Sequence, residues 1–61
     1  METATKTVSH YTVMAETATH GFITVAVTAR FEDALTYRTV HSLTDAEVWA
    51  IYTDATSERV D

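Results

Sequence analysis

The stretch HSLTDAEVWAIY, residues 41–52, decides the fold, because the hydrophobic period of the chain can change within it. Thr44 followed by Glu47 matches the capping box, in which the two side chains satisfy backbone N–H groups at a helix start. Leu43 and Val48 occupy the positions of a hydrophobic staple around the same start. Both patterns predict that a helix begins at Thr44.

The residues that follow fit the same helix. Val48, Ile51, Tyr52 and Ala55 have the i, i+3, i+4, i+7 spacing of one helical face. A strand over VWAIYT agrees with residue propensity, but it accounts for neither the cap nor the spacing. The sequence therefore predicts a helix from about residue 45 to 57.

Two strands and a turn are expected upstream, over residues 8–16 and 22–31, with a five-residue loop at 17–21. Gly21, the only glycine, can take a positive φ in that loop. Pairing Tyr11 with Val27, Val13 with Val25 and Ala15 with Ile23 places the apolar sets on one face. The expected core residues are Val13, Val25, Val27 and Ile51. The expected solvated face carries His10, Thr12, Thr24, Thr28 and Arg30.

The segment 31–42 is ambiguous. Its threonine, tyrosine and valine residues favour a strand, whereas early acids and the later Arg38 and His41 suit a helix dipole. The strand interpretation gives an α+β fold: a three-stranded antiparallel β-meander with a C-terminal α-helix packed on one face, β-β-β-α. The alternative is β-β-α-β, with the helix at 31–42 and a final strand at 46–55. Either way, residues 1–61 form one small domain, with 1–6 and 58–61 expected to fray.

Composition excludes several functional classes. The chain of 61 residues has no cysteine, a net charge of −5 and no apolar run near the roughly 20 residues that span a bilayer. We therefore expect a cytoplasmic protein that binds neither nucleic acid nor a membrane directly. His10, His20 and His41 do not converge in the expected fold, and no nucleophile or phosphate-loop motif is present. These features predict a non-enzymatic protein without a metal or cofactor.

The small size and the threonine-rich, lysine-poor, acidic composition resemble those of phage-encoded accessory proteins. This resemblance implies an inhibitor that acts in the host cytoplasm. The alternative element order, β-β-α-β, resembles that of small phage-encoded inhibitors of host RNA polymerase.

The acidic residues are concentrated near the C-terminus: residues 1–44 carry four acids and three bases, a net charge of −1, and residues 45–61 carry five acids and one base, a net charge of −4. On the expected helix, Glu47, Asp54 and Glu58 form one stripe beside Trp49. These four residues are the candidate partner-binding site, for a larger protein with a basic surface, with imitation of nucleic-acid phosphates as one form of this hypothesis. The alternative is that the stripe is a solvated helix face that only keeps the protein soluble. The other hypothesis is a self-assembling homo-oligomer, such as a homodimer, with no separate ligand.

Overall fold

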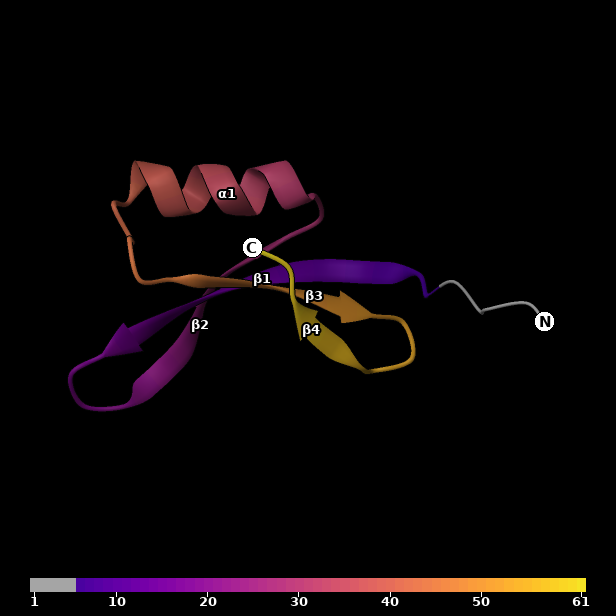
Figure 1. Ribbon diagram of the computed structural model, residues 1–61, viewed down its shortest axis with the longest axis horizontal. Helices are drawn as coiled ribbons and strands as arrows, with labels where there is room; N and C mark the ends of the chain where they lie inside the picture. The colour runs from indigo at the N-terminus through magenta and orange to yellow at the C-terminus, as the bar shows by residue number, and fades with distance from the viewer. Residues whose placement is uncertain (1–5) are drawn as a thin grey trace.

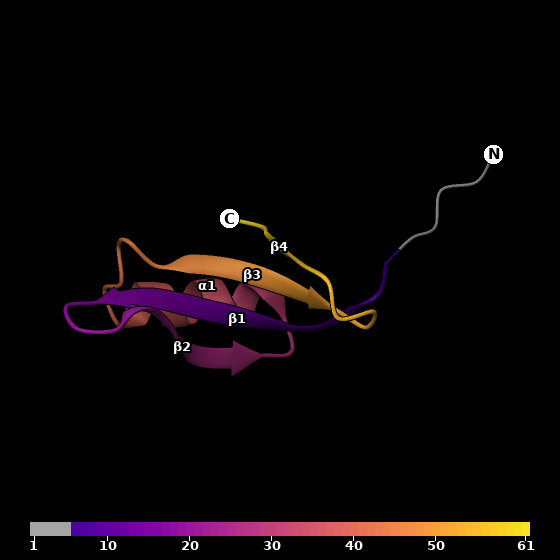
Figure 2. The same cartoon turned by 90° about the horizontal axis from the view of Figure 1, so that it is seen from below.

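The structure, a computed structural model, describes residues 6–61 and places four strands and one helix within them. The elements are β1 (Val8–Thr17), β2 (Gly21–Thr28), α1 (Phe31–Val40), β3 (Glu47–Tyr52) and β4 (Ser57–Arg59). All strand pairs are antiparallel, in the order β2-β1-β3-β4, and α1 covers one face of the sheet (Figure 1). Seen from below, the strands lie in front of the helix (Figure 2). These features confirm the expected small α+β fold, with an antiparallel sheet and a helix on one face.

The central strand is β1, which pairs with β2 on one side and β3 on the other. Because β2 and β3 both run antiparallel to β1, they run in the same direction. Parallel strands need a long crossover connection, and here α1 supplies it. The expected meander order is therefore wrong.

The helix expected at 45–57 is wrong, because Glu47–Tyr52 forms strand β3 beside β1. Valine, tryptophan, isoleucine and tyrosine are strong strand formers, and β1 offers them a free edge to pair with. The apparent capping box is part of a turn instead. The Ala46 N–H donates to the Leu43 carbonyl over 3.1 Å, closing a turn around Thr44. A local cap pattern was outweighed here by a full ladder of interstrand hydrogen bonds.

The strand expected at 31–42 is also wrong, because these residues form α1. Phe31, Ala34 and Leu35 have the i, i+3, i+4 spacing of a helix and pack against the sheet, with Ala34 fully buried. The alternative order β-β-α-β is right as far as Tyr52, but it does not include β4.

The two segments expected to fray are residues 1–6 and 58–61. Residues 1–5 lie outside the described part of the chain. Lys6 contacts the β3–β4 connection, since its Nζ donates to Thr56 Oγ1 over 2.8 Å. Residues Ser57–Arg59 pair with β3 as strand β4.

The pairing of β1 with β2 agrees with the expected register at one end only. Ala15 faces Ile23 as predicted, but Val13 faces Ala26 and Tyr11 faces Thr28. The register shifts by one residue between Val13 and Met14, which leaves Val25 as the extra residue of a β-bulge. Such a shift reverses the face on which later side chains lie.

The bulge explains which core predictions are correct. Val13 is fully buried as expected, and Val25 packs at the core's edge. Val27, beyond the bulge, is 62% exposed, so its placement in the core is wrong. Ile51 is half-buried on the opposite face, and the buried positions in β3 belong to Val48 and Ala50. The core therefore lies between α1 and the middle of β1 and β3.

Among residues 6–61, three have positive φ: Gly21 at 68°, Ser42 at 56° and Ala55 at 72°. Gly21 has the positive φ that the sequence predicts, but it is the first residue of β2, and the loop is residues 18–20 where residues 17–21 were expected. Ser42 follows the C-cap of α1 in a Schellman motif, because its N–H donates to Thr39 and the Leu43 N–H donates to the Arg38 carbonyl. Only one of the three left-handed positions has the residue that favours this conformation.

The β3–β4 hairpin turns through Thr53, Asp54 and Ala55. The Ala55 N–H donates to the Tyr52 carbonyl over 3.0 Å, and the Tyr52 N–H donates to the Thr56 carbonyl over 2.8 Å. This is a three-residue hairpin loop that ends in a left-handed residue, a common loop that usually has glycine where Ala55 stands. Because glycine is missing, no turn signal marks this hairpin in the sequence.

Candidate binding site on the open face of the sheet

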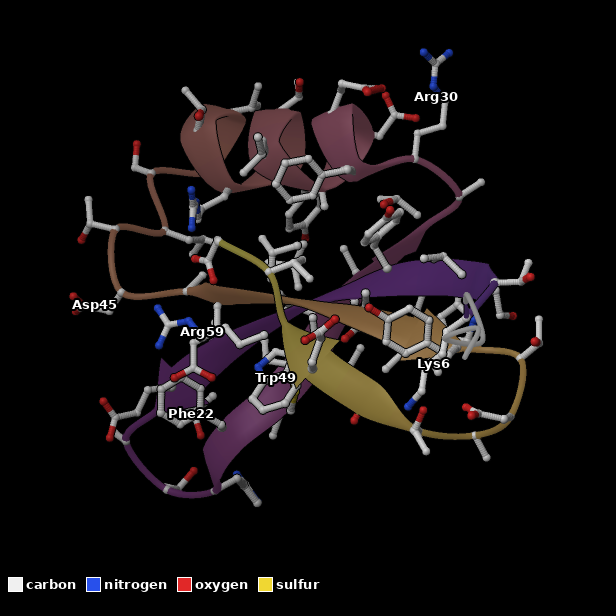
Figure 3. All side chains as sticks on the ribbon, turned by 45° about the vertical axis from the view of Figure 1, so that its right-hand side comes forward. Lys6, Phe22, Arg30, Asp45, Trp49 and Arg59 are labelled. Carbon is white, nitrogen blue, oxygen red and sulfur yellow. The ribbon has the colours of Figure 1, made fainter. Side chains whose placement is uncertain are left out.

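The sheet face away from α1 is called the open face. Strand pairing arranges its side chains in rows, because directly paired residues point to the same side. The longest row crosses all four strands: Arg59, Trp49, Thr12 and Val27. Figure 3 shows Trp49, Arg59 and Phe22 gathered on the side of the sheet away from α1. The open face thus combines aromatic, aliphatic and charged side chains.

Trp49 is at the centre of this face and is held in a defined orientation. Its indole Nε1 donates to Glu47 Oε1 over 2.9 Å. Thr12, paired with both Trp49 and Val27, is only 8% exposed although no helix covers it. The half-buried indole therefore shields the centre of the sheet while still presenting surface to solvent.

Glu47 connects Trp49 to a chain of ion pairs. Arg59 Nη1 lies 3.4 Å from Glu47 Oε2, and Arg59 Nε donates to Asp61 Oδ1 over 2.8 Å. Asp61 also accepts from Arg38 of α1. The network therefore joins the end of the helix, the segment after β4 and the indole on the open face.

Asp61 is the most enclosed charge of this network, with 7% of its side chain exposed. Burial by itself would raise its pKa, because it removes water from the charged carboxylate. Hydrogen bonds involving Arg59, the Val48 backbone and Arg38 act in the opposite direction and hold the pKa of Asp61 below its usual value. Asp61 is therefore ionised at neutral pH and fixes both arginines.

The four predicted partner-binding residues do not form one stripe, because the helix that would align them is absent. Glu47 and Trp49 lie together on the open face. Glu58 is paired with Ala50, on the side of the sheet that faces α1, and accepts from the Tyr52 hydroxyl. Asp54 lies in the β3–β4 turn. Only half of the candidate set is therefore brought together.

Asp54 and Glu58 belong to a separate cluster around the β3–β4 turn. Lys6 Nζ lies 3.8 Å from Asp54 Oδ2 and 5.4 Å from the centre of the Tyr52 ring. Hydrogen bonds from Thr56 lower the pKa of Asp54, and the hydrogen bond to Glu58 raises the pKa of the Tyr52 hydroxyl. These acids are engaged in shaping the turn.

The three histidines are apart, as expected. His10 lies on the open face beside Ser9, and His20 lies in the first hairpin loop beside Thr19. His41 caps α1 and stacks on Tyr37, with 4.2 Å between ring centres. Within residues 6–61, no three His, Asp or Glu side chains are grouped in a way that could hold a metal ion.

Two open depressions flank the α1–β3 connection, with volumes of about 340 and 220 Å3. Both include Ser42, Leu43 and Thr44. Neither depression holds a convergent set of catalytic groups, so the open face is the stronger candidate for binding.

Comparison with known proteins adds no relative: no protein-family model, curated protein or solved structure matches this chain. Across the described residues 6–61, no helix is long and apolar enough to cross a membrane.

Sequence reasoning missed Arg38, Arg59 and Asp61. Arg59 and Asp61 are two residues apart, the spacing at which side chains of an extended segment lie on one side. That spacing was the available signal. It could not identify Arg38, whose approach to Asp61 depends on the correct placement of α1.

Proposed function

We propose that the protein is a non-enzymatic binding protein that modulates a larger protein through the Trp49 surface, which comprises Trp49, Glu47, Arg59, Met14 and Ile51. The observation that supports this proposal is the half-buried indole, oriented by Glu47 on a sheet face that no helix covers. Tryptophan and arginine are the residues most enriched among those that dominate binding energy at interfaces.

The charge distribution supports a partner with a basic surface. Each of the four basic side chains lies in an ion pair: Lys6 with Asp54, Arg30 with Glu32, Arg38 with Asp61, and Arg59 with Glu47 and Asp61. Because all four bases are paired, the net charge of −5 comes from the acidic side chains in excess of them. An acidic molecule is steered towards a basic partner, and its paired arginines do not favour contact with phosphates.

The proposed location is the cytoplasm, and a phage origin would make the partner a host protein. The hypothesis that the protein imitates nucleic-acid phosphates is supported by Glu47 and by the net charge. It no longer rests on a stripe of three carboxylates.

The test is differential capture on immobilised protein, followed by mass spectrometry. Trp49→Leu keeps an apolar cover over Thr12 but removes the ring and its N–H donor. Val40→Leu is the control, because Val40 is 70% exposed on α1, away from the open face. A partner should be retained by the wild type and by the control and be lost from Trp49→Leu. Equal retention by all three folded proteins would rule out the Trp49 surface.

Two matched double variants test the electrostatic part of the proposal. Glu16→Gln with Glu47→Gln removes two charges from the open face, whereas Asp33→Asn with Asp45→Asn removes two exposed charges elsewhere. With the captured partner, the first pair should slow association more and reduce its dependence on salt. Equal slowing by both pairs would show that only net charge matters.

A further inference from the structure

Exposed apolar side chains are concentrated on β2. Among the described residues, four large hydrophobic side chains are exposed, and three of them lie on this strand: Phe22 at 43%, Ile23 at 41% and Val27 at 62%. The strand lies within residues 17–29, the longest stretch of the sequence without Lys, Arg, Asp or Glu. β2 is therefore an exposed, uncharged and apolar strand in an otherwise acidic protein.

The two edges of the sheet differ in how they are protected. β4 is three residues long, carries Glu58 and Arg59, and is followed by the ion pairs of Asp61. Short length and charge are the usual means by which proteins prevent an edge strand from pairing with another chain. β2 is eight residues long, and it has neither charge nor proline. Of the two edges, β2 is therefore the longer and the uncharged one, and its protection is limited to the bulge at Val25, whose carbonyl accepts from the Tyr37 hydroxyl of α1.

We propose that β2 pairs antiparallel with β2 of a second copy around a two-fold axis, joining the two four-stranded sheets into one. A two-fold axis makes a strand its own partner, so no second binding partner has to be recognised. This self-pairing uses a different part of the molecule from the proposed Trp49 surface and does not depend on it.

Charge favours a second copy as the occupant of this edge. Two molecules with a net charge of −5 repel each other wherever their acids meet. The stretch 17–29 is where two copies can approach without opposing carboxylates. A basic partner, by contrast, would gain no electrostatic attraction from this neutral strand.

The bulge at Val25 makes the self-pairing consistent on both faces. Phe22 pairs with Glu16 and Val27 pairs with Thr12, so both side chains lie on the open face although they are five residues apart. In a regular strand, residues five apart point to opposite faces. An axis between Thr24 and Val25 therefore places Phe22 of one copy opposite Val27 of the other on the open face. At the axis itself, Thr24 of one copy meets the bulge residue Val25 of the other. Ile23 and Ala26 meet in the same way on the face towards α1.

The mass of the full-length protein in solution tests this proposal. Light scattering across a concentration series should show a shift from 6.8 kDa towards twice that mass. The double variant Thr24→Lys with Val27→Lys places four lysines near the axis of a dimer, and it should weaken dimerisation by at least about tenfold, or 1.4 kcal/mol. The control is Thr36→Lys with Thr39→Lys, which adds the same charge at exposed positions of α1 and should dimerise like the wild type.

Hydrogen exchange locates the interface. Amides in Gly21–Thr28 should become more protected as concentration rises, and those in Ser57–Arg59 should not. A mass of 6.8 kDa at millimolar concentration, or equal weakening by both lysine pairs, would overturn the proposal. Protection of β2 only after addition of another protein would assign the edge to that protein instead.

The two proposals fail separately. Trp49→Leu should dimerise like the wild type even if it captures no partner. The β2 lysine variant should still capture the partner as a monomer.

Discussion

The two hairpins of this sheet are stabilised in different ways, the first by its backbone ladder and turn and the second by side-chain ion pairs. In the β1–β2 hairpin, a long ladder closes at Gly21, whose backbone suits the turn. In the β3–β4 hairpin, a shorter ladder joins Trp49–Ile51 to Ser57–Arg59. It closes at Ala55, a residue that disfavours the positive φ of this turn. The second hairpin compensates through side chains, because Asp61 ties the segment after β4 to α1 and to Arg59. A hairpin can therefore persist without turn signals when contacts beyond its end hold the strand in place.

The largest effect is expected in the core that the two hairpins share. Val48 and Val13 are fully buried and face each other across β3 and β1. Val48→Ala should lower the free energy of unfolding by about 2–4 kcal/mol, because it removes two methyl groups and leaves a cavity. In a domain of this size such a loss should unfold both hairpins together. The measurement is chemical denaturation with backbone chemical shifts, and a β1–β2 hairpin that persists alone would contradict the shared core.

A smaller effect, specific to the second hairpin, is expected for Asp61→Asn. The change should cost about 1–2 kcal/mol at pH 7, since it weakens charge-assisted hydrogen bonds to two arginines. The pKa of Asp61 is lowered in the folded protein, so the carboxylate stabilises the fold above its unfolded pKa of about 3.9. This contribution is lost as pH falls through the lower, folded value.

The difference in stability between the wild type and Asp61→Asn should therefore shrink below about pH 4. Denaturation curves between neutral and strongly acidic pH measure it. A difference that stays constant with pH would mean that the stabilisation comes from packing and not from charge.

Exchanging the turn residues tests the comparison directly. Gly21→Ala should cost about 1 kcal/mol, because alanine is disfavoured at a φ of 68°. A Cβ there would meet no atom within 4 Å, so crowding adds nothing to the cost. Thermal or chemical unfolding measures the loss. Unchanged stability would show that the long β1–β2 ladder, and not its turn, determines the first hairpin.

The smallest effect is a gain. Ala55→Gly should stabilise the protein by about 0.5 kcal/mol, because relief of the left-handed strain exceeds the added freedom of the unfolded chain. Ala18→Gly, in the first hairpin loop, is the control: Ala18 has no positive φ, so the change should only destabilise. Loss of stability in Ala55→Gly would show that the turn is not strained by alanine.

The sequence predicted those parts of the fold that have local signals. The β1–β2 hairpin has alternating apolar residues and a glycine at its turn, and the sequence predicts both strands, although the loop is residues 18–20 and not the expected 17–21. The bulge at Val25 was not foreseen, because nothing in an unbroken alternating pattern marks where a strand carries an extra residue. Its consequence, the exposure of Val27, was missed with it.

The second half of the chain could not be predicted because its local patterns are ambiguous. FEDALTYRTV contains strand formers that nevertheless form α1, and EVWAIY follows a cap pattern that belongs to a turn. The competition is decided by long-range pairing with β1, which no short window of sequence contains. The grouping of Glu47 with Trp49 as a candidate site survived this error, since the two residues are close in sequence. The inclusion of Asp54 and Glu58 depended on the predicted helix and was therefore lost with it.

The central place of β1 has a kinetic consequence. The β1–β2 hairpin closes a short loop and can form within microseconds, whereas β3 must return across the whole of α1 before Trp49 meets Thr12. Between these events the second edge of β1 is unpaired, and its apolar face is uncovered. We therefore expect the docking of β3 to be the slower of the two pairings, and changes that hasten α1 formation should speed it.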